Sequence, residues 1–543
     1  MKRQKTTGIL LLLISLCALA ALLITDSRRP RLSALMITDE EAEAITSARQ
    51  PSDLRLLRSL HFNDYPLFFD EGADTFYYSL IRGDSTASDP QVKAETGGSG
   101  IRVVFRTGAI NSETIGNNVP LSVIAYDREN YREYRVYCTT LPLMNIESEI
   151  EFIHGTQKDR DLKMTLLDNR QEARQHLIRA EGVIHVRGND STTVFPKQAY
   201  KMTLYQDSPG GNPRELKQSL LGMREDGEWL LYAGYNDQER IRNVFSSALW
   251  NRTNAGENEF GIPNGMEYRF LELFMNGKYW GLYAIGYPLD SGQMIPMKHT
   301  EDVERIYIFK KAFWAEEYSK LPAELQMRDY EIKGDDTRTH ETEARALLKT
   351  YDDWLLARLN GSGSAGSPVS ADMQNAIDTW LFVALTQGYD TVWPTSEFVN
   401  MFLTIIQCKD RAAAIYTPWD LDLTWGNLRR TDAKNTTVPY GIRSDDNSFL
   451  MLRNPAHFLL TEDPDRLRSR YFELRSGGWS DEAAETLIRG FETDIFDSGA
   501  YLRDMEKWPE ASNGDPMLKL QTFTAYVRER FRAMDAFAES WGK

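Results

Sequence analysis

The sequence predicts an α+β fold in which a small β-sandwich precedes a larger domain with a helical C-terminal part. Between 61 and 142, short β-rich runs separated by turn residues recur about every ten residues, as in β-sandwiches. From 143 onward strand-like and helix-like patterns alternate, and 455–540 reads as several amphipathic helices. A chain of 543 residues exceeds one ordinary core, so two or three domains are expected.

The composition limits the classes of partner. With 42% hydrophobic and 26% charged residues, the chain can bury real cores. Its formal net charge is −16, whereas a nucleic-acid-binding protein needs a basic face, so we expect no nucleic-acid partner. An acidic surface instead favours cationic partners or substrates. The oligomeric state is left open.

The N-terminus carries a targeting signal. Lys2, Arg3 and Lys5 precede an uncharged apolar run at 8–24, whose length lies between a signal-peptide core and a full membrane span. We favour a signal-anchor in residues 1–25 with its basic end inside, and a cleaved signal peptide is the alternative. The bulk of the chain is then outside the cytoplasm, either held by a single-pass membrane segment or secreted.

Two segments separate this signal from the larger domain. Residues 26–60 are polar and are predicted to form a juxtamembrane stalk with one short helix. The β-sandwich follows at 61–142 and is interpreted as a spacer, because no polar cluster in it is placed for chemistry. Its clearest predicted strands lie at 75–80, 101–106, 121–126 and 134–139.

The larger domain, 143–543, begins with strand patterns. Residues 182–187 and 196–205 flank a polar turn and predict a hairpin, and 228–233 predicts a further strand. Asn236 and Asp237 can cap the helix that follows. Asn276-Gly277 lies between two apolar runs, which strongly indicates a type I′ hairpin.

Helices and further strands complete the domain. A charged helix is predicted at 338–359, and a Gly- and Ser-rich connection at 360–370. A helix with an apolar face at 373–385 follows and is predicted to end near Gly388, with Asp390 in an irregular segment beyond its end. A strand is predicted at 398–406, with Asn400 near its start. Cys138 and Cys408 lie in apolar runs and are expected to be buried free thiols.

Two acids one residue apart follow the β-rich run at 412–416. If this run stays extended, Asp420 and Asp422 project from the same face. Adjacent carboxylates repel each other unless a cation or a shared proton lies between them. Hard oxygen ligands of this kind suit Mg²⁺ or Mn²⁺. An isolated Asp-x-Asp is more often a solvated turn, so the surrounding motifs must decide.

These motifs occur in a specific order. They are Arg187-Gly188-Asn189-Asp190-Ser191, Pro196-Lys197 with Tyr200-Lys201, Trp229-Leu230-Leu231, Tyr235-Asn236-Asp237, Ile241-Arg242-Asn243, Phe274-Met275-Asn276-Gly277-Lys278-Tyr279-Trp280-Gly281-Leu282-Tyr283, Asp390, Asn400 and Pro418-Trp419-Asp420-Leu421-Asp422. Together they resemble the CotH kinase family, a group of spore coat protein H-like proteins related to atypical protein kinases. The resemblance extends over 140–540 and implies an atypical protein-kinase-like domain.

The resemblance implies roles for particular residues. Phosphoryl transfer needs a cation at the phosphates, acids that hold metal, and an acid that orients the attacking hydroxyl. By resemblance, Asp390 is the catalytic acid, with Lys197 at the phosphates of ATP. The metal ligands for Mg²⁺ or Mn²⁺ are Asn400, Asp420 and Asp422, and the other nucleotide-binding candidates are Arg187, Asn189, Ser191 and Lys201. The implied activity is phosphorylation of Ser or Thr in a surface or envelope protein.

Two departures from the family pattern support a rival hypothesis. Tyr287 stands where family members often carry a glutamate, which would pair the nucleotide-binding lysine; Asp290 is a candidate substitute. An insertion at 393–397 also separates Asp390 from Asn400. The alternative is therefore a catalytically weak or inactive surface or envelope-assembly protein. Glycan hydrolysis by paired carboxylates is disfavoured, because that reaction needs acids on opposite sides of a cleft.

Single residues also have simpler interpretations. Lys197 and Lys201 lie four positions apart in one predicted strand, and one of them is expected to be merely solvated. Arg187 and Arg242 can serve as structural ion-pair partners instead. Trp419 and Trp425 are expected to pack in the core rather than to stack on a nucleotide.

Overall fold

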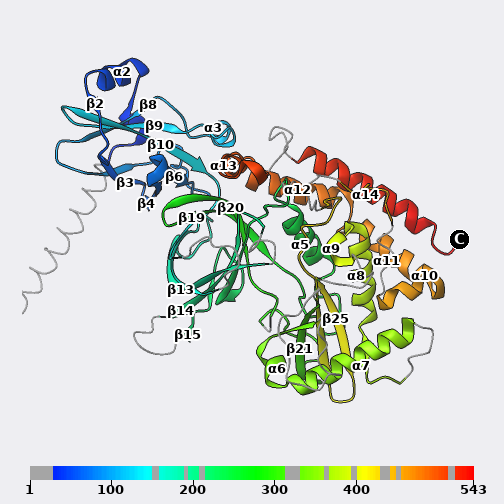
Figure 1. The fold of residues 1–543 in the computed structure, drawn as a ribbon. Coiled ribbons are helices and arrows are strands. Elements are labelled where there is room, and N and C mark those ends of the chain that lie inside the picture. Colours follow the sequence, from blue (N-terminus) through cyan, green and yellow to red (C-terminus); the bar gives the residue numbers. More distant parts are fainter. Residues whose placement is uncertain are drawn as a thin grey trace, which may run out of the picture.

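The computed structural model describes residues 29–149, 158–188, 194–206, 214–290, 292–311, 330–359, 366–392, 400–428, 441–447, 454–511 and 520–543. Within them the fold is mixed α+β, as predicted (Figure 1). No helix among the described residues is long and apolar enough to cross a membrane. The apolar run at 8–24 lies outside them, so the N-terminal membrane segment stays a prediction.

Two β-sheets form the N-terminal part of the molecule. A seven-stranded sheet has the order β1-β8-β9-β10-β6-β5, with β2 beside β10, and a three-stranded sheet has the order β4-β3-β7. Phe62, Val123 and Val136 are fully buried in the apolar core that these sheets share. The strands are β1 (Met36–Ile37), β2 (Gln50–Pro51), β3 (Leu57–Phe62), β4 (Tyr65–Pro66), β5 (Phe68–Asp70), β6 (Thr75–Ser79), β7 (Val92–Thr96), β8 (Arg102–Arg106), β9 (Leu121–Tyr126) and β10 (Asn130–Thr139).

The segment 29–60 differs from the separate stalk that we expected. β1 and β2 pair with strands of the seven-stranded sheet, and Leu32 is fully buried in its core. The one expected helix is present as α2 (Asp39–Ser47), which begins with a capping box between Thr38 and Glu41. The two N-terminal sheets are here called the β-domain. Residues 29–60 are part of it, because their few apolar side chains complete its core.

The next sheet closes into a barrel. Its strands follow the order β13-β12-β11-β19-β20-β18-β14-β15, and the path closes because β13 also pairs with β14. Met202, Trp229 and Leu271 fill the interior and are fully buried. The strands are β11 (Leu143–Ser148), β12 (Arg160–Leu167), β13 (Leu177–Arg187), β14 (Ala199–Gln206), β15 (Arg214–Glu215), β18 (Glu228–Tyr232), β19 (Tyr268–Met275) and β20 (Lys278–Gly286).

Both predicted hairpins of the barrel are confirmed. β13 and β14 are antiparallel, with Arg187 paired to Ala199 next to the turn. β19 and β20 are joined by Asn276 and Gly277, whose φ angles are 51° and 72°. Positive φ at both central residues is the signature of a type I′ turn.

A five-stranded sheet with the order β22-β21-β24-β25-β23 forms the centre of the remaining domain. Its strands are β21 (Val303–Lys311), β22 (Tyr330–Lys333), β23 (Val369–Ala371), β24 (Met401–Cys408) and β25 (Ala412–Pro418). The predicted helices at 338–359 and 373–385 are α7 (Glu341–Leu359) and α8 (Met373–Thr386). Cys138 and Cys408 are buried free thiols, as predicted.

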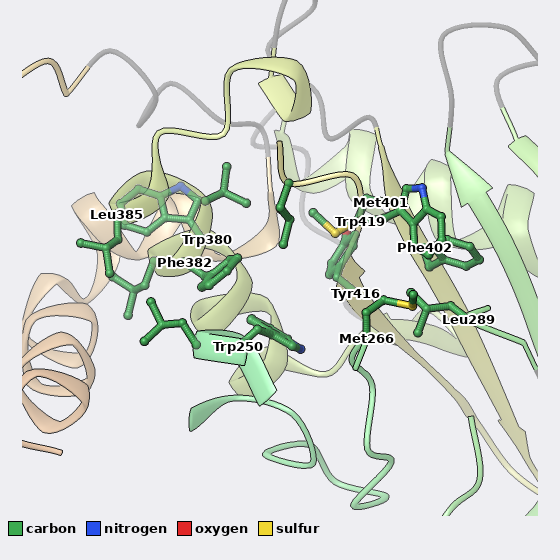
Figure 2. Packing of buried hydrophobic residues seen from close by; sticks show 14 of the residues in the cluster. Trp250, Met266, Leu289, Trp380, Phe382, Leu385, Met401, Phe402, Tyr416 and Trp419 are labelled. Atoms are coloured by element: carbon green, nitrogen blue, oxygen red, sulfur yellow. The ribbon is translucent and has the colours of Figure 1, made fainter. Parts of the chain in front are cut away.

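An apolar core joins this sheet to the helices (Figure 2). Trp250 packs edge-on against Phe382 with ring centroids 5.1 Å apart, and Phe402 packs against Trp419 at 5.2 Å. Trp419 is only 7% exposed, which confirms its predicted packing role. Because Trp419 directly precedes Asp420, the core fixes the place where the acids begin.

The C-terminal part is helical, as predicted for 455–540. Figure 1 shows most of these helices in the part of the molecule that holds α8, whereas α13 (Ala500–Lys507) lies beside β20 of the barrel. The remaining elements are η1 (Leu32–Leu35), η2 (Glu71–Ala73), α3 (Ser112–Gly116), β16 (Gln218–Ser219), β17 (Glu225–Asp226), α5 (Arg242–Thr253), α6 (Asp335–Thr339), α9 (Tyr389–Val392), η5 (Pro455–Phe458), α10 (Leu459–Glu462), α11 (Pro464–Ser476), α12 (Asp481–Ile495), α13 (Ala500–Lys507), η6 (Pro509–Ala511) and α14 (Gln521–Glu539).

Candidate active site

Three strand ends meet at one edge of the five-stranded sheet. The antiparallel register places Lys311 at the end of β21 beside Met401 at the start of β24. Met401 in turn pairs with Pro418 at the end of β25. Asn400 and the residues after Pro418 therefore emerge at the same edge, although they are far apart in the sequence.

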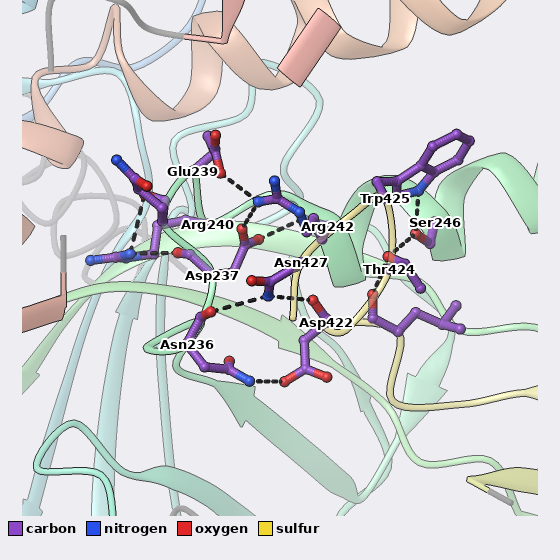
Figure 3. Close-up of polar contacts among 12 residues, drawn as sticks. Asn236, Asp237, Glu239, Arg240, Arg242, Ser246, Asp422, Thr424, Trp425 and Asn427 are labelled. Atoms are coloured by element: carbon purple, nitrogen blue, oxygen red, sulfur yellow. Dashed lines mark hydrogen bonds and ion pairs between the residues drawn. The ribbon is translucent and has the colours of Figure 1, made fainter. Parts of the chain in front are cut away.

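The loop that follows β25, residues 419–427 and here called the acid loop, is held by side chains of neighbouring elements (Figure 3). Asn243 of α5 accepts a hydrogen bond from the loop backbone at 3.2 Å. The Nδ2 group of Asn427 donates to the backbone oxygens of Asn236 and Asp422, at 3.1 and 2.9 Å. These contacts fix the loop against α5 and against the connection between the barrel and α5.

The two acids of this loop are not on a strand. β25 ends at Pro418, and Asp420 has a φ of 59°, in the left-handed region. Asp420 and Asp422 were expected to share a strand face if the run stayed extended, and this condition is not met, because the backbone turns directly after Pro418. The turn leaves Asp420 exposed and Asp422 half-buried.

Asp422 lies among other carboxylates. Burial raises its pKa well above the usual range, and the charge of Asp420 raises it further. Asn236 opposes the shift by donating from Nδ2 to Oδ2 of Asp422 at 2.5 Å. The charges of Asp390 and Asp237 also raise this pKa. The acids thus lie close enough to repel one another, which is the arrangement expected where a cation binds.

Asp390 reaches this group from the end of α8. It lies in the short helix α9, not in the irregular segment that we expected, because the chain makes one more helical turn after α8. The first residue of α9, Tyr389, donates its N–H to the oxygen of Leu423 in the acid loop at 3.0 Å. Asn400 donates from Nδ2 to Oδ2 of Asp390 at 2.7 Å. Asp390 is half-buried.

The donor set fits a hard divalent cation. Among the described residues, the only three His, Cys, Asp or Glu side chains with ligand atoms within 4.8 Å of one another are His299, Glu301 and Asp302, an exposed trio at the opposite end of β21. Asp390, Asp420 and Asp422 do not form such a group. Asp420 and Asp422 instead offer two carboxylates, as is usual for Mg²⁺ bound together with phosphates. The amide of Asn400, with its nitrogen turned to Asp390, keeps its carbonyl oxygen as a further hard donor.

Two cations accompany the acid loop. The Arg187 guanidinium lies 5.4 Å from the centre of the Trp419 ring, and the Lys310 ammonium lies 6.0 Å from it. Arg187 comes from the end of β13 in the barrel, whereas Lys310 comes from β21 in the five-stranded sheet. Both are half-buried. The cations therefore approach the start of the acid loop from two different sheets.

Lys197 is bound elsewhere, in a group here called the Lys197 cluster (Lys197, Arg240 and Asp504). Lys197 is fully buried, and its ammonium donates to the oxygen of Leu282 and to Oδ1 of Asp504, both at 2.6 Å. Asp504 of α13 also accepts from Nε of Arg240 at 3.0 Å. Burial lowers the pKa of Lys197 to about 8, although Asp504 opposes this shift. The protein's own groups thus occupy the ammonium of Lys197.

Lys201 lies apart from both groups. Its ammonium pairs with Oε1 of Glu228 at 2.6 Å, and both side chains are about 30% exposed, at 29% and 31%. Although Lys197 and Lys201 are four positions apart, only Lys201 belongs to β14; Lys197 precedes the strand. Lys201 is therefore the lysine with the solvated, structural environment.

Asp290 does not stand in for the family glutamate beside Lys197. Asp290 pairs with Arg224 at 3.3 Å, and the same guanidinium lies 4.3 Å from the ring centre of Tyr287. Asp290, the candidate substitute, is therefore not the acidic partner of Lys197. Asp504 takes that place, from a helix more than two hundred residues further along the chain. The predicted nucleotide-binding residues Asn189 and Ser191 lie outside the described residues.

Sequence reasoning missed Lys310 and Asp504. Lys310 ends an apolar run in β21, and a strand that ends in charged residues is a weak signal by itself. Asp504 lies four positions after the buried Ala500, so it is an acid on the apolar face of a helix. A buried acid at such a position signals a paired charge but does not name its partner.

Comparison with known proteins adds one match. Residues 184–534 match the family model described as CotH kinase protein. No curated protein matches the chain. The matched region begins within β13 and ends within α14, so it includes both cations, the Lys197 cluster, Asp390 and the acid loop. The N-terminal sheets lie before it.

Proposed function

The chain belongs to the CotH kinase family, whose model matches more than half of its residues, and on this premise we propose that it is an ATP- and divalent-metal-dependent protein kinase. One observation carries the proposal: Asp390, bound by Asn400, lies within electrostatic range of Asp422 beside the acid loop. Phosphoryl transfer needs an acid for the substrate hydroxyl next to acids for metal. Transfer to Ser or Thr is the corresponding reaction.

Each side chain has a distinct task in this proposal. Asp390 accepts the proton of the attacking hydroxyl, and the hydrogen bond from Asn400 fixes the orientation of its carboxylate. Asp420, Asp422 and the Asn400 carbonyl hold Mg²⁺ or Mn²⁺, which neutralises phosphate charge when it is bound. Asn236 and Asn427 keep the acid loop in place, so the acids need little rearrangement.

The proposed substrate is a surface or envelope protein outside the cytoplasm. The support is the basic N-terminus followed by the apolar run at 8–24, which is typical of export signals. The net charge of −16 favours a basic substrate segment. Protease treatment of intact cells tests the location: an exported chain is digested outside the cell, whereas an internal one is protected.

Radiolabel transfer tests the activity directly. The purified full chain is incubated with γ-labelled ATP, Mg²⁺ or Mn²⁺ and a basic Ser-rich acceptor, beside Asp390→Asn and Asp420→Asn. We expect label on the acceptor with the wild type and at least a hundredfold less with either variant. Asp410→Asn is the matched control, because Asp410 is an exposed acid at the opposite end of β24. Equal transfer by all four proteins would contradict the assignment.

A second candidate function rests on Lys197. Its ammonium is fully buried and bound to Asp504 and Leu282, so the expected phosphate contact is not made in this conformation. This favours the alternative of a catalytically weak or inactive family member that assembles surface or envelope material. Nucleotide that raises the melting temperature without any transfer would support this alternative.

A further inference from the structure

Arg187 and Lys310 form a pair of cations next to the acids, and no role has yet been given to Lys310. We propose that these two side chains bind the terminal phosphates of the nucleotide, a task expected of Lys197. The inference rests on the proposed function, since it assigns phosphate ligands for the same site. The inference also goes beyond the proposed function, because it makes Lys310 a phosphate-binding residue and Lys197 a buried structural residue.

The first support is position. Lys310 is the penultimate residue of β21 and pairs with Phe402, the second residue of β24. It therefore lies at the sheet edge from which Asn400 and Asp420 emerge. Arg187 ends β13, next to the turn of the β13–β14 hairpin. Their closeness to Trp419, at 6.0 and 5.4 Å, brings both charges to the residue that precedes Asp420.

The second support is the state of the two charges. Within the described part of the chain, the side chains of Arg187 and Lys310 make no hydrogen bond and no ion pair, and both contact the Trp419 ring. Glu331, which faces Lys310 across the β21–β22 pair, forms its ion pair with Lys333 at 2.9 Å. Two half-buried cations without such partners are costly unless an anion binds them.

The electrostatic environment agrees with this picture. Burial lowers the pKa of Lys310, and the charge of Arg187 lowers it further, whereas Glu331 and Asp420 oppose the shift. Lys310 and Arg187 thus repel each other, and Asp420 is an acid that the proposed metal also needs. A phosphate that bridges metal and cations would neutralise both the acids and the cation pair.

The alternatives for this role are weaker. The ammonium of Lys197 already has two acceptors at 2.6 Å and is fully buried. Releasing it would leave Asp504 and Arg240 to reorganise inside the protein. Lys201 is paired with Glu228. Of the cations that the sequence suggested, only Arg187 faces the acid loop, and Lys310 completes the pair.

The test compares phosphate affinity with stability in the full chain. Lys310→Gln and Arg187→Gln are titrated with Mg²⁺ and ATP, with Mg²⁺ and tripolyphosphate, and with adenosine. We expect each variant to bind ATP and tripolyphosphate at least tenfold more weakly, with unchanged adenosine affinity. The melting temperature without ligand should stay equal or rise, because one of two repelling cations has been removed.

Lys311→Gln is the matched control, because it removes the same charge one residue away while its ammonium lies over Tyr330 at 5.0 Å. Its ATP affinity should equal that of the wild type. Wild-type tripolyphosphate affinity in both test variants would overturn the inference. A lower melting temperature with equal losses for adenosine and ATP would also overturn it, by showing a structural role. If the wild type binds neither ATP nor tripolyphosphate, the proposed function itself fails.

Discussion

The Lys197 cluster and the acid loop both hold several charged side chains close together, yet they are built in opposite ways. In the Lys197 cluster one carboxylate, Asp504, serves two cations and also accepts from the backbone of Leu282 at 3.0 Å. At the acid loop, Asp420 and Asp422 repel each other, and so do the nearby cations Arg187 and Lys310. The first arrangement pairs opposite charges, whereas the second brings like charges together, which the metal and phosphates of the proposed function would neutralise.

Under the proposed function, this difference separates a structural role from a binding role. Asp504 lies on α13, and its neighbour Arg503 binds Glu272 of β19 with two hydrogen bonds, at 2.9 and 2.7 Å. Arg503 also donates to Asn118 in the N-terminal domain at 2.6 Å. α13 therefore fixes the barrel, the helical part and the β-domain together. Charges that remain unsatisfied in a stable protein are typical of functional sites.

The largest expected effect comes from Asp504→Asn. It leaves Lys197 and Arg240 buried without a carboxylate, which should lower the free energy of unfolding by about 3–5 kcal/mol. Urea denaturation measures this change. Glu506→Gln is the matched control, because it removes an exposed charge from the same helix and should change stability by less than about 0.5 kcal/mol. Equal effects of both changes would remove the distinction between the two regions.

Burial of the Lys197 ammonium should make the stability of the protein depend on pH. The pKa of Lys197 is lowered to about 8, whereas in the unfolded chain it is near its ordinary value of 10.5. Above pH 8 the unfolded chain therefore binds more protons, so stability should rise with pH, by about 1–2 kcal/mol up to pH 9.5. Denaturation of Lys197→Met should lose this rise, and Lys201→Met should keep it. A flat wild-type profile would show that Asp504 keeps Lys197 protonated.

Removing a carboxylate from the acid loop should change stability in the opposite direction to Asp504→Asn. Asp422→Asn removes one of two repelling carboxylates, while the new amide oxygen still accepts the hydrogen bond from Asn236. Without metal we expect the free energy of unfolding to rise by about 1 kcal/mol, and phosphoryl transfer to be lost. Thermal melting in a chelator measures the first effect and label transfer the second. A destabilised variant would mean that Asp422 is a structural acid.

Local patterns predicted most of the fold. The Asn276-Gly277 turn, the apolar stripe of α8 and the strands of the N-terminal sheets depend on neighbouring residues, and each lies where the sequence indicated. Closure of the barrel was not predicted, because it depends on β19 pairing in parallel with β11, which lies far away in the chain. The integration of 29–60 into the β-domain depends likewise on distant contacts.

The site was predicted unevenly for a similar reason. Motif order pointed to Asp390, Asn400 and Asp422, and the structure brings them within range of one another. The left-handed turn at Asp420 has no local signal, since Asp is not restricted to it. Lys197 pairs with Asp504 of α13, and nothing in the sequence of that helix indicates which residue Asp504 contacts. Sequence alone therefore could not tell which of Lys197 and Lys201 is buried.

The smallest expected effect is that of Lys201→Ala, and comparison with Lys197→Ala tests which of the two lysines is structural. Lys201→Ala breaks a half-exposed ion pair with Glu228, which should cost less than about 1 kcal/mol and leave ATP affinity unchanged. The same substitution at Lys197 leaves Asp504 with Arg240 alone and opens a cavity in the core, so its destabilisation should be several times larger. Denaturation and ATP titration of both variants make the comparison. Weaker ATP binding by Lys201→Ala would return Lys201 to the nucleotide site and show that its pairing with Glu228 opens when nucleotide binds.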